Sequence, residues 1–570
     1  MSEAAGSVVR QAHNIKRGTD MSEKLQQTEE GGEVQANNKT SWHREIGQGI
    51  MTAYFIVIAV IYPFYAPGGY VRIGEVKYLF FRNVTLVTIA VMMLVIMASF
   101  LGKRCVGRLV ELYRHMSVTD WFAYGYFIVV MLSYLCSAYK ADALWGADGW
   151  YMGVVTQMSF ILLYFMVSRF LPCNRKQLAV WLTAAGGVFL LGILNRYSVY
   201  PVEMEGQTET FISTLGNINW FCGYWSIMAS MGITLYWSSE HRLARAAAGI
   251  FSMAAILAGI TQGSSSAYLV FLTVFGVLLI FSVQSNRRIY RYLELCMIFA
   301  VSCQIGRIMR YMPGLSYNYG NNIYPTGSRM TDLLLNGNAA LWLLMGAVLC
   351  YGFLRVLEKR CGFRTENCRN GSRIFAAVIV FIIGIGCIVL VMHSGMLHTE
   401  KTTETLEAEE GGGEPFNHDW GNGRGAALNS GLKAFESMDT VHKLVGIGPD
   451  CFAMYVYEIP ELAEQLSEQF GSQRLTNAHN EWLTILVNTG VLGLFCYAGM
   501  FMVSIIRYAV KAKEQPLLYV FLVSLLAYTV HNMVSFQQIL STPYVFIVLG
   551  IGEGLVCGNC AEDQMRGQDE

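Results

Sequence analysis

The chain has 570 residues, of which 54% are hydrophobic and only 14% charged, and its mean hydropathy is +0.38. Polar surface is too scarce to enclose so large an apolar content in water, which excludes an ordinary soluble globular protein. The 41 basic and 41 acidic residues cancel, so charge gives no reason to expect a nucleic-acid partner, and we expect none. Repeated apolar runs of bilayer length instead predict a polytopic membrane protein.

The chain begins with a polar stretch, 1–49, without the short apolar core and cleavage site of a signal peptide, so we expect a retained tail. Apolar segments of crossing length follow. Because backbone groups in hydrocarbon must be paired internally, they predict an all-α fold of about 14 transmembrane helices, eleven within 50–393 and three within 481–556. The segments begin near residues 50, 84, 121, 153, 178, 220, 247, 267, 293, 336, 374, 481, 517 and 543.

Basic residues in alternate links predict the orientation. The links that contain Lys103, Arg175 and Arg287 are basic, whereas the link at 140–150 has one basic residue. Lys and Arg near crossing ends are retained on the cytoplasmic side, so the basic links are inner ones. With an even number of crossings, we expect both termini in the cytoplasm, including a C-terminal tail at 557–570.

One large polar insertion, 394–480, falls on the outer face in this topology. A loop of this length in a tightly linked bundle is usually functional or disordered. Its first part, "EKTTETLEAEEGGGEP", is acidic and Gly-rich, and a solvated linker is a more natural interpretation than a cation site. The remainder is expected to be folded and to carry the chemistry.

Two short helices and a turn are predicted in this second part. Leu428, Leu432 and Phe435 recur at helical spacing and indicate one apolar face of a helix that begins at Arg424. Pro460 is suited to the first position of a second helix. Between them, "GIGPDCF" has the glycines and proline of a tight turn.

A polar cluster, His479, Asn480 and Glu481, precedes the twelfth crossing. Imidazole can be neutral near pH 7 and can then accept a proton from a sugar hydroxyl, although a lone histidine here is more often an interfacial residue bonded to a loop. Arg424 lies on the same face, at a helix N-terminus that favours an anion, and its guanidinium suits a diphosphate. Together they suggest chemistry on a lipid-linked diphosphate.

These segments resemble a known family. "HNEWLTILVNTGVLGLF", preceded by "GRGAALNSGLKAF" and "LVGIGPDCF", is similar to the C-terminal signature of the O-antigen ligase and O-antigen polymerase superfamily. "STLGNINW" resembles the Gly-Asn-x-Asn motif of that family, and "LWGADGWYMG" resembles its earlier outer link. The resemblance runs from about Trp145 to the C-terminus and is strongest from Gly423 to Phe495.

The resemblance implies an enzyme of the bacterial cytoplasmic membrane that transfers a glycan with inversion, without a metal or other cofactor. The donor would be a glycan on undecaprenyl diphosphate in membrane lipid, and the acceptor a glycan, lipid, protein or wall polymer. His479 would deprotonate the acceptor hydroxyl, and Arg424 would bind the diphosphate. Repeat-unit polymerases share these motifs and remain an alternative. The candidate substrate-binding residues are Asn480, Glu481, Asn217, Asn219, Arg329 and His531.

One departure from the family concerns a second arginine after a middle crossing. Here "TQGSSSAYL" offers only glutamine and serine side chains. Arg329 or Arg310 in the following outer link could substitute, or each could be a plain interfacial charge. His531 and Asn532, late in the thirteenth crossing, either line the same cavity or hydrogen-bond between helices.

Other classes are less consistent with the sequence. A lipid-linked glycan transporter or flippase would be expected to show internal repeats and charges within the crossings, and neither is evident here. A noncatalytic scaffold would not need Arg424 and His479 on one face. The pair Cys557 and Cys560 has no further ligands nearby for zinc, so we expect no metal site.

Overall fold

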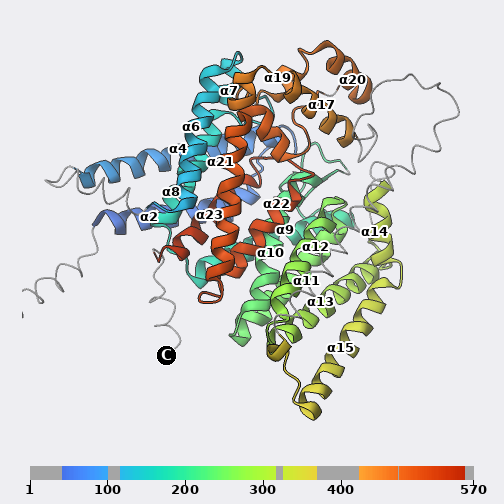
Figure 1. The fold of residues 1–570 in the computed structure, drawn as a ribbon. Coiled ribbons are helices and arrows are strands. Elements are labelled where there is room, and N and C mark those ends of the chain that lie inside the picture. The colour runs from blue at the N-terminus through green and yellow to red at the C-terminus, as the bar shows by residue number, and fades with distance from the viewer. Residues whose placement is uncertain are drawn as a thin grey trace, which may run out of the picture.

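The computed structural model describes residues 42–100, 116–208, 210–315, 325–368, 423–472 and 474–558, except for the side chains of 100 and 325–329. These residues are mainly helical (Figure 1), which confirms an all-α polytopic protein in outline. Eight of the described helices are long and apolar enough to cross a membrane, and four apolar helices are shorter. The number of 14 crossings stays a prediction, and the segment near 374 lies outside the described residues.

The elements follow one another in three groups. The first comprises α2 (Trp42–Ile56), the π-helical turn η1 (Val57–Ile61), α3 (Tyr62–Phe64), α4 (Ile73–Phe100), α6 (Val118–Cys136), α7 (Lys140–Trp145), α8 (Val154–Phe170) and α9 (Arg175–Arg196). The second comprises β1 (Phe211–Ile212), β2 (Gly216–Asn217), α10 (Ile218–Ser238), α11 (Arg242–Thr261), α12 (Ser266–Ser282), α13 (Asn286–Arg310), α14 (Pro325–Leu335), α15 (Ala339–Cys361) and η2 (Thr365–Cys368). The third comprises α17 (Arg424–Ser437), α18 (Thr440–Val445), α19 (Phe452–Val456), α20 (Pro460–Phe470), α21 (Glu481–Lys511), α22 (Leu518–His531) and α23 (Thr542–Val556).

The C-terminal helices pack inside the bundle. Helix α21 lies along α6, α22 along α10, and α23 along α8. Nearly every residue of α22 and α23 is buried, which agrees with their being apolar on all sides. His531, the last residue of α22, is also buried, whereas Thr529 and Val530 before it are half-buried.

The described part of the polar insertion, from 423 onward, forms a layer of short helices at one end of the bundle, where α17, α19 and α20 gather beside α7 (Figure 1). This layer has a small apolar core of its own, to which Phe452, Leu462 and Leu466 belong. The helices predicted to begin at Arg424 and Pro460 begin at those residues, and the stretch "GIGPDCF" turns between α18 and α19.

The buried face of α17 differs from the one predicted. Leu428, Leu432 and Phe435 are only half-buried. Small residues make the closest contacts instead, and a side chain added at Gly431 would lie 2.8 Å from Leu483 and 3.1 Å from Ala478. Small residues occupy the buried face of α17 because they let its backbone approach the start of α21 closely. The face comprises Ala427, Ser430, Gly431 and Ala434.

A break in α21 joins the loop layer to the bundle. Gly490 has a φ of +69°, and a Cβ there would lie 2.3 Å from the backbone of Leu444, so only glycine fits. Nearby, the carbonyl of Asn488 accepts from the Ser133 hydroxyl at 2.7 Å and from the Gly448 N–H at 3.0 Å. The loop layer is thus hydrogen-bonded to the backbone of α21.

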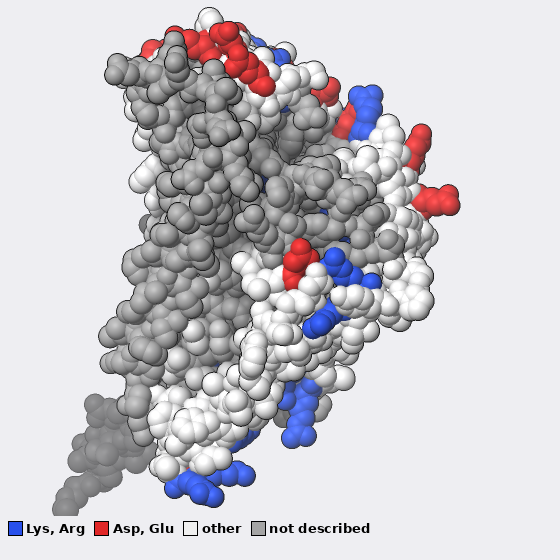
Figure 2. All heavy atoms as spheres, turned by 90° about the vertical axis from the view of Figure 1, so that its right-hand side faces the viewer, with Lys and Arg blue, Asp and Glu red and all other residues white. Residues whose placement is uncertain are grey.

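Charge divides along the molecule. On the face drawn in Figure 2, Asp and Glu lie mainly toward the upper end, and Lys and Arg occupy the lower end. Helix α20 in the loop layer carries Glu461, Glu464 and Glu468, whereas the last turn of α15 carries Lys359 and Arg360. This separation is the one expected if the loop layer lies outside the cytoplasm.

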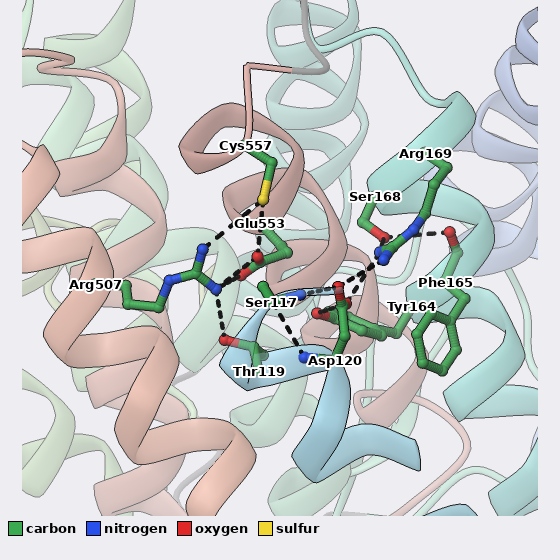
Figure 3. A network of polar contacts seen from close by, with 10 residues as sticks. All are labelled: Ser117, Thr119, Asp120, Tyr164, Phe165, Ser168, Arg169, Arg507, Glu553 and Cys557. Atoms are coloured by element: carbon green, nitrogen blue, oxygen red, sulfur yellow. Dashed lines mark hydrogen bonds and ion pairs between the residues drawn. The ribbon is translucent and has the colours of Figure 1, made fainter. Parts of the chain in front are cut away.

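At the opposite end of α21, two ion pairs tie four helices together (Figure 3). Arg507 of α21 contacts both carboxylate oxygens of Glu553 in α23, at 2.6 and 2.8 Å. Arg169 of α8 contacts both oxygens of Asp120 in α6, at 3.0 and 2.6 Å. Both carboxylates are 1% exposed, and each buried negative charge is matched by a guanidinium, through two nitrogens of Arg169 at Asp120 and through one nitrogen of Arg507 at Glu553.

Candidate functional site

Arg424 lies near three segments that are distant in the sequence. It is half-buried and begins α17, where Gly423 precedes it with a φ of +83°. Its positive charge acts on the imidazoles of His479 and His531 and on the thiol of Cys222 in α10. The tertiary structure therefore gathers the predicted arginine and both predicted histidines into one region below the loop layer.

His479 adopts a backbone conformation that is uncommon for a residue with a side chain. Its φ is +50°, and its N–H donates to the Asn477 side chain at 3.0 Å. Its ring packs against Phe536, with 5.2 Å between the ring centroids. Left-handed conformations of this kind cost about 1 kcal/mol or more and are concentrated at functional sites.

The imidazole of His479 is neutral at physiological pH. Burial, with the Arg424 charge as a second cause, lowers the pKa of His479 to about 3. A neutral ring has a lone pair with which to accept a proton, as the sequence analysis required. The same low pKa, which is caused mainly by burial, makes the ring a weak base.

Asn480, predicted to bind substrate, is occupied by structural contacts. Its side-chain oxygen accepts from the Leu483 N–H at 3.0 Å and so caps α21, while its Nδ2 donates to the Met533 carbonyl at 2.9 Å. The residue therefore fixes where α21 begins relative to the end of α22.

Glu481 is also predicted to bind substrate, and it is 1% exposed. Its carboxylate accepts from the Tyr497 hydroxyl at 2.6 Å, from the Tyr528 hydroxyl at 3.0 Å and from Nδ2 of Asn532. Its backbone N–H donates to the Asn532 carbonyl at 2.9 Å. Among the described residues no Lys or Arg pairs with it, so its charge is held by neutral donors.

His531 ends α22 and is fully buried. Its Nδ1 lies 2.6 Å from Oδ1 of Asn532, whereas its Nε2 has no hydrogen-bond partner among the residues that the structure describes. A buried acceptor of this kind is suited to a hydrogen bond from a ligand hydroxyl or N–H group.

The two asparagines of the "GNIN" stretch lie on the bundle side of the site. The hairpin of β1 and β2 pairs Phe211 with Asn217, whose side chain accepts from the Asn219 N–H at 2.8 Å and caps α10. Oδ1 of Asn219 accepts from the Ser264 hydroxyl at 3.1 Å. The serine-rich turn before α12 therefore contacts the start of α10, which the sequence alone did not show.

A buried arginine that the sequence did not single out, Arg196, lies beside the serine-rich turn. Arg310 pairs with Asp332 at 3.3 Å, and the side chain of Arg329 lies outside the described residues. Arg196, at the end of α9, is 5% exposed and donates to the Gln262 carbonyl. An arginine at the outer end of an otherwise apolar segment was the only available signal in the sequence.

Asp450 is a second residue that the sequence analysis missed. Its carboxylate accepts from the N–H groups of Ala147 and Met152, both at 2.8 Å, and so ties the loop to the outer link between α7 and α8. Burial raises the pKa of Asp450 to about 7, against the opposing effect of these two bonds. Asp450 and Glu481 line one pocket, together with Trp150, Asn477 and Phe536.

The fold and this site define an all-α polytopic membrane protein whose folded polar loop covers a buried group of histidine, arginine and carboxylate side chains. Residues 330–498 match the family model described as O-Antigen ligase, which supports membership of the O-antigen ligase superfamily and confirms the resemblance over that part of the sequence. The matched part contains Arg424 and His479. No curated protein matches the chain.

Proposed function

We propose that the protein transfers an oligosaccharide or polysaccharide from undecaprenyl diphosphate to an acceptor hydroxyl on the outer face of the cytoplasmic membrane. The observation that carries this proposal is that α17, which begins at Arg424, packs against the segment that holds His479, and that the charge of Arg424 acts on this imidazole. A guanidinium beside a neutral imidazole, at the mouth of a membrane helix, suits a lipid diphosphate and a hydroxyl nucleophile.

The proposed reaction is a single displacement. His479 takes the proton of the acceptor hydroxyl, the acceptor oxygen forms a bond to the anomeric carbon of the donor sugar, and the bond from that carbon to the phosphate oxygen breaks. The electron pair leaves on undecaprenyl diphosphate, and Arg424 offsets the developing charge. Because a bound diphosphate is negative, it opposes the influence of Arg424 on His479 and makes the imidazole a better base when donor is present.

A repeat-unit polymerase differs from this proposal only in its acceptor, a second lipid-linked glycan. A flippase differs in chemistry, because it would move the donor without breaking the sugar–phosphate bond. The separating assay uses purified protein with an undecaprenyl diphosphate-linked glycan and measures free undecaprenyl diphosphate. Release that depends on added acceptor supports transfer, and transbilayer movement without release would contradict it.

The Arg424→Lys variant tests the proposed clamp within the same assay. Lysine keeps the charge but loses the planar fork, and loss of one charge-assisted hydrogen bond is worth roughly 1.5 to 3 kcal/mol, or about ten- to a hundredfold in rate or affinity. The expected loss falls on donor affinity. Turnover within about twofold of wild type would show that Arg424 only caps or solubilises the loop.

A further inference from the structure

The connection from Glu481 to His531 determines which ring nitrogen of His531 carries a hydrogen. Asn532 donates through Nδ2 to the Glu481 carboxylate, so its Oδ1 must face the imidazole, at 2.6 Å. The opposite amide orientation would place an acceptor against a carboxylate. Since Oδ1 can only accept, Nδ1 of His531 is the donor.

The remaining nitrogen, Nε2, is then an acceptor in the neutral ring. The amide of Asn532 lies between the Glu481 carboxylate and the His531 imidazole. It therefore orients the ring but places no negative charge next to it. This differs from an imidazole bonded directly to an aspartate, where the carboxylate stabilises the imidazolium. The fully buried Nε2 has no donor among the described residues.

We propose that Nε2 of His531 accepts a hydrogen bond from a hydroxyl of the donor sugar next to the diphosphate. This assignment rests on the proposed function. Ionised diphosphate oxygens are acceptors and offer no hydrogen, whereas sugar hydroxyls do. Asn480 donates to the Met533 carbonyl and Glu481 to the Asn532 carbonyl, so the end of α22 that carries His531 lies against the segment that carries His479.

Glu481 has a different role in this arrangement from the one predicted from the sequence. Three donors already occupy its carboxylate, namely the hydroxyls of Tyr497 and Tyr528 and the amide of Asn532. It is a positioning residue that holds Asn532, which in turn holds His531. A site that hydrogen-bonds a substrate hydroxyl discriminates strongly against ligands without one, because the buried acceptor is then left unpaired.

Two substitutions at His531 separate the role of Nε2 from that of the ring as a whole. The His531→Asn variant keeps a polar atom near the position of Nδ1 but removes the acceptor at Nε2. The His531→Gln variant keeps a polar atom near Nε2. Both are compared with wild type after size-exclusion chromatography and thermal unfolding have shown that each variant is folded.

The measurement is the affinity for two probes, undecaprenyl diphosphate with and without a single N-acetylglucosamine. We expect the sugar to improve wild-type affinity, and we expect His531→Asn to reduce that improvement about tenfold. His531→Gln should keep the improvement within about threefold. An unchanged improvement in His531→Asn, or an equal loss in both variants, would overturn the assignment.

Failure of the proposed function gives a different result. Wild-type protein that binds the sugar-bearing probe more tightly, with His531→Asn alone losing this preference, supports the acceptor role even if no undecaprenyl diphosphate is released. Such protein would then be a binder or carrier of lipid-linked sugar. Equal affinity of wild type for the two probes would overturn the inference, whatever the turnover.

Discussion

The two ends of α21 both lie beside buried carboxylates, but the partners of these carboxylates differ. At one end Glu553 is matched by Arg507, and nearby Asp120 is matched by Arg169 (Figure 3). At the other end Glu481 is held by neutral donors and Asp450 by two backbone N–H groups. Among the described residues neither of these two has a Lys or Arg partner.

This difference separates a structural end from a candidate functional end. A buried Arg–carboxylate ion pair satisfies both charges and joins helices, so it leaves no free charge for a ligand. The loop end instead keeps an uncompensated carboxylate at Glu481, a strained His479 and an unpartnered Nε2 on His531. Unpaired buried polar groups and a strained backbone lower the stability of a protein. They are therefore usually kept only at functional sites.

The first prediction concerns the two sides of the membrane, where the expected difference is all or none. In a background without reactive cysteines, Ser437→Cys in the loop layer should react with an impermeant thiol reagent added from outside. Lys359→Cys, at the opposite end of the molecule, should not react until the membrane is opened. The reverse pattern would remove the loop layer from the outer face and with it the proposed site.

The second prediction concerns the base. His479→Ala should reduce glycan transfer by about 10²- to 10⁴-fold, the usual contribution of general acid–base catalysis, without loss of expression or membrane insertion. Initial rates of undecaprenyl diphosphate release are the measurement, and size-exclusion profiles control for folding. Near-normal turnover would mean that His479 is only an interfacial residue.

The third prediction sets matched Glu→Gln variants at the two ends against each other. Glu553→Gln removes a buried ion pair and should lower the free energy of unfolding by about 3 kcal/mol, while turnover per folded molecule stays within about twofold. Glu481→Gln should lower turnover about tenfold, because one amide oxygen cannot accept from Tyr497, Tyr528 and Asn532 together, so Asn532 and His531 are held less firmly.

Thermal unfolding and turnover per folded molecule are measured for both of these variants. The comparison between the ends fails if the two variants lose turnover equally. It also fails if Glu481→Gln changes stability alone.

The fourth prediction concerns a pH dependence at Asp450. Its pKa of about 7 in the folded protein lies above the value of about 4 in an unfolded chain, so folding favours the protonated form. Stability of the loop layer should therefore fall as pH rises from about 4 to about 7, by up to about 1.4 kcal/mol per pH unit, and level off above. Asp450→Asn should flatten this profile.

The measurement for Asp450 is amide hydrogen exchange of residues 440–475 across this pH range. The Asp450→Asn variant is a suitable control, because its amide oxygen can still accept from the N–H groups of Ala147 and Met152. An unchanged profile in Asp450→Asn would assign the pH dependence to another group.

The sequence by itself determined the class of protein and much of the loop. Apolar runs of bilayer length can only be helices, because hydrocarbon offers backbone groups no other partner. Helical spacing and Pro460 were enough to predict α17 and α20, since helix starts are signalled locally. Arg424 and His479 were found because both lie in the polar insertion and in family-like stretches.

Only the tertiary structure decided which polar groups meet. Asp450 accepts a hydrogen bond from a link about 300 residues away in the sequence, and Glu481 accepts one from Asn532, which follows α22. The buried face of α17 was mispredicted because close approach to α21 favours small residues over leucines. Such contacts depend on how whole helices pack, and on the break at Gly490, whereas sequence patterns report only on what each segment does alone.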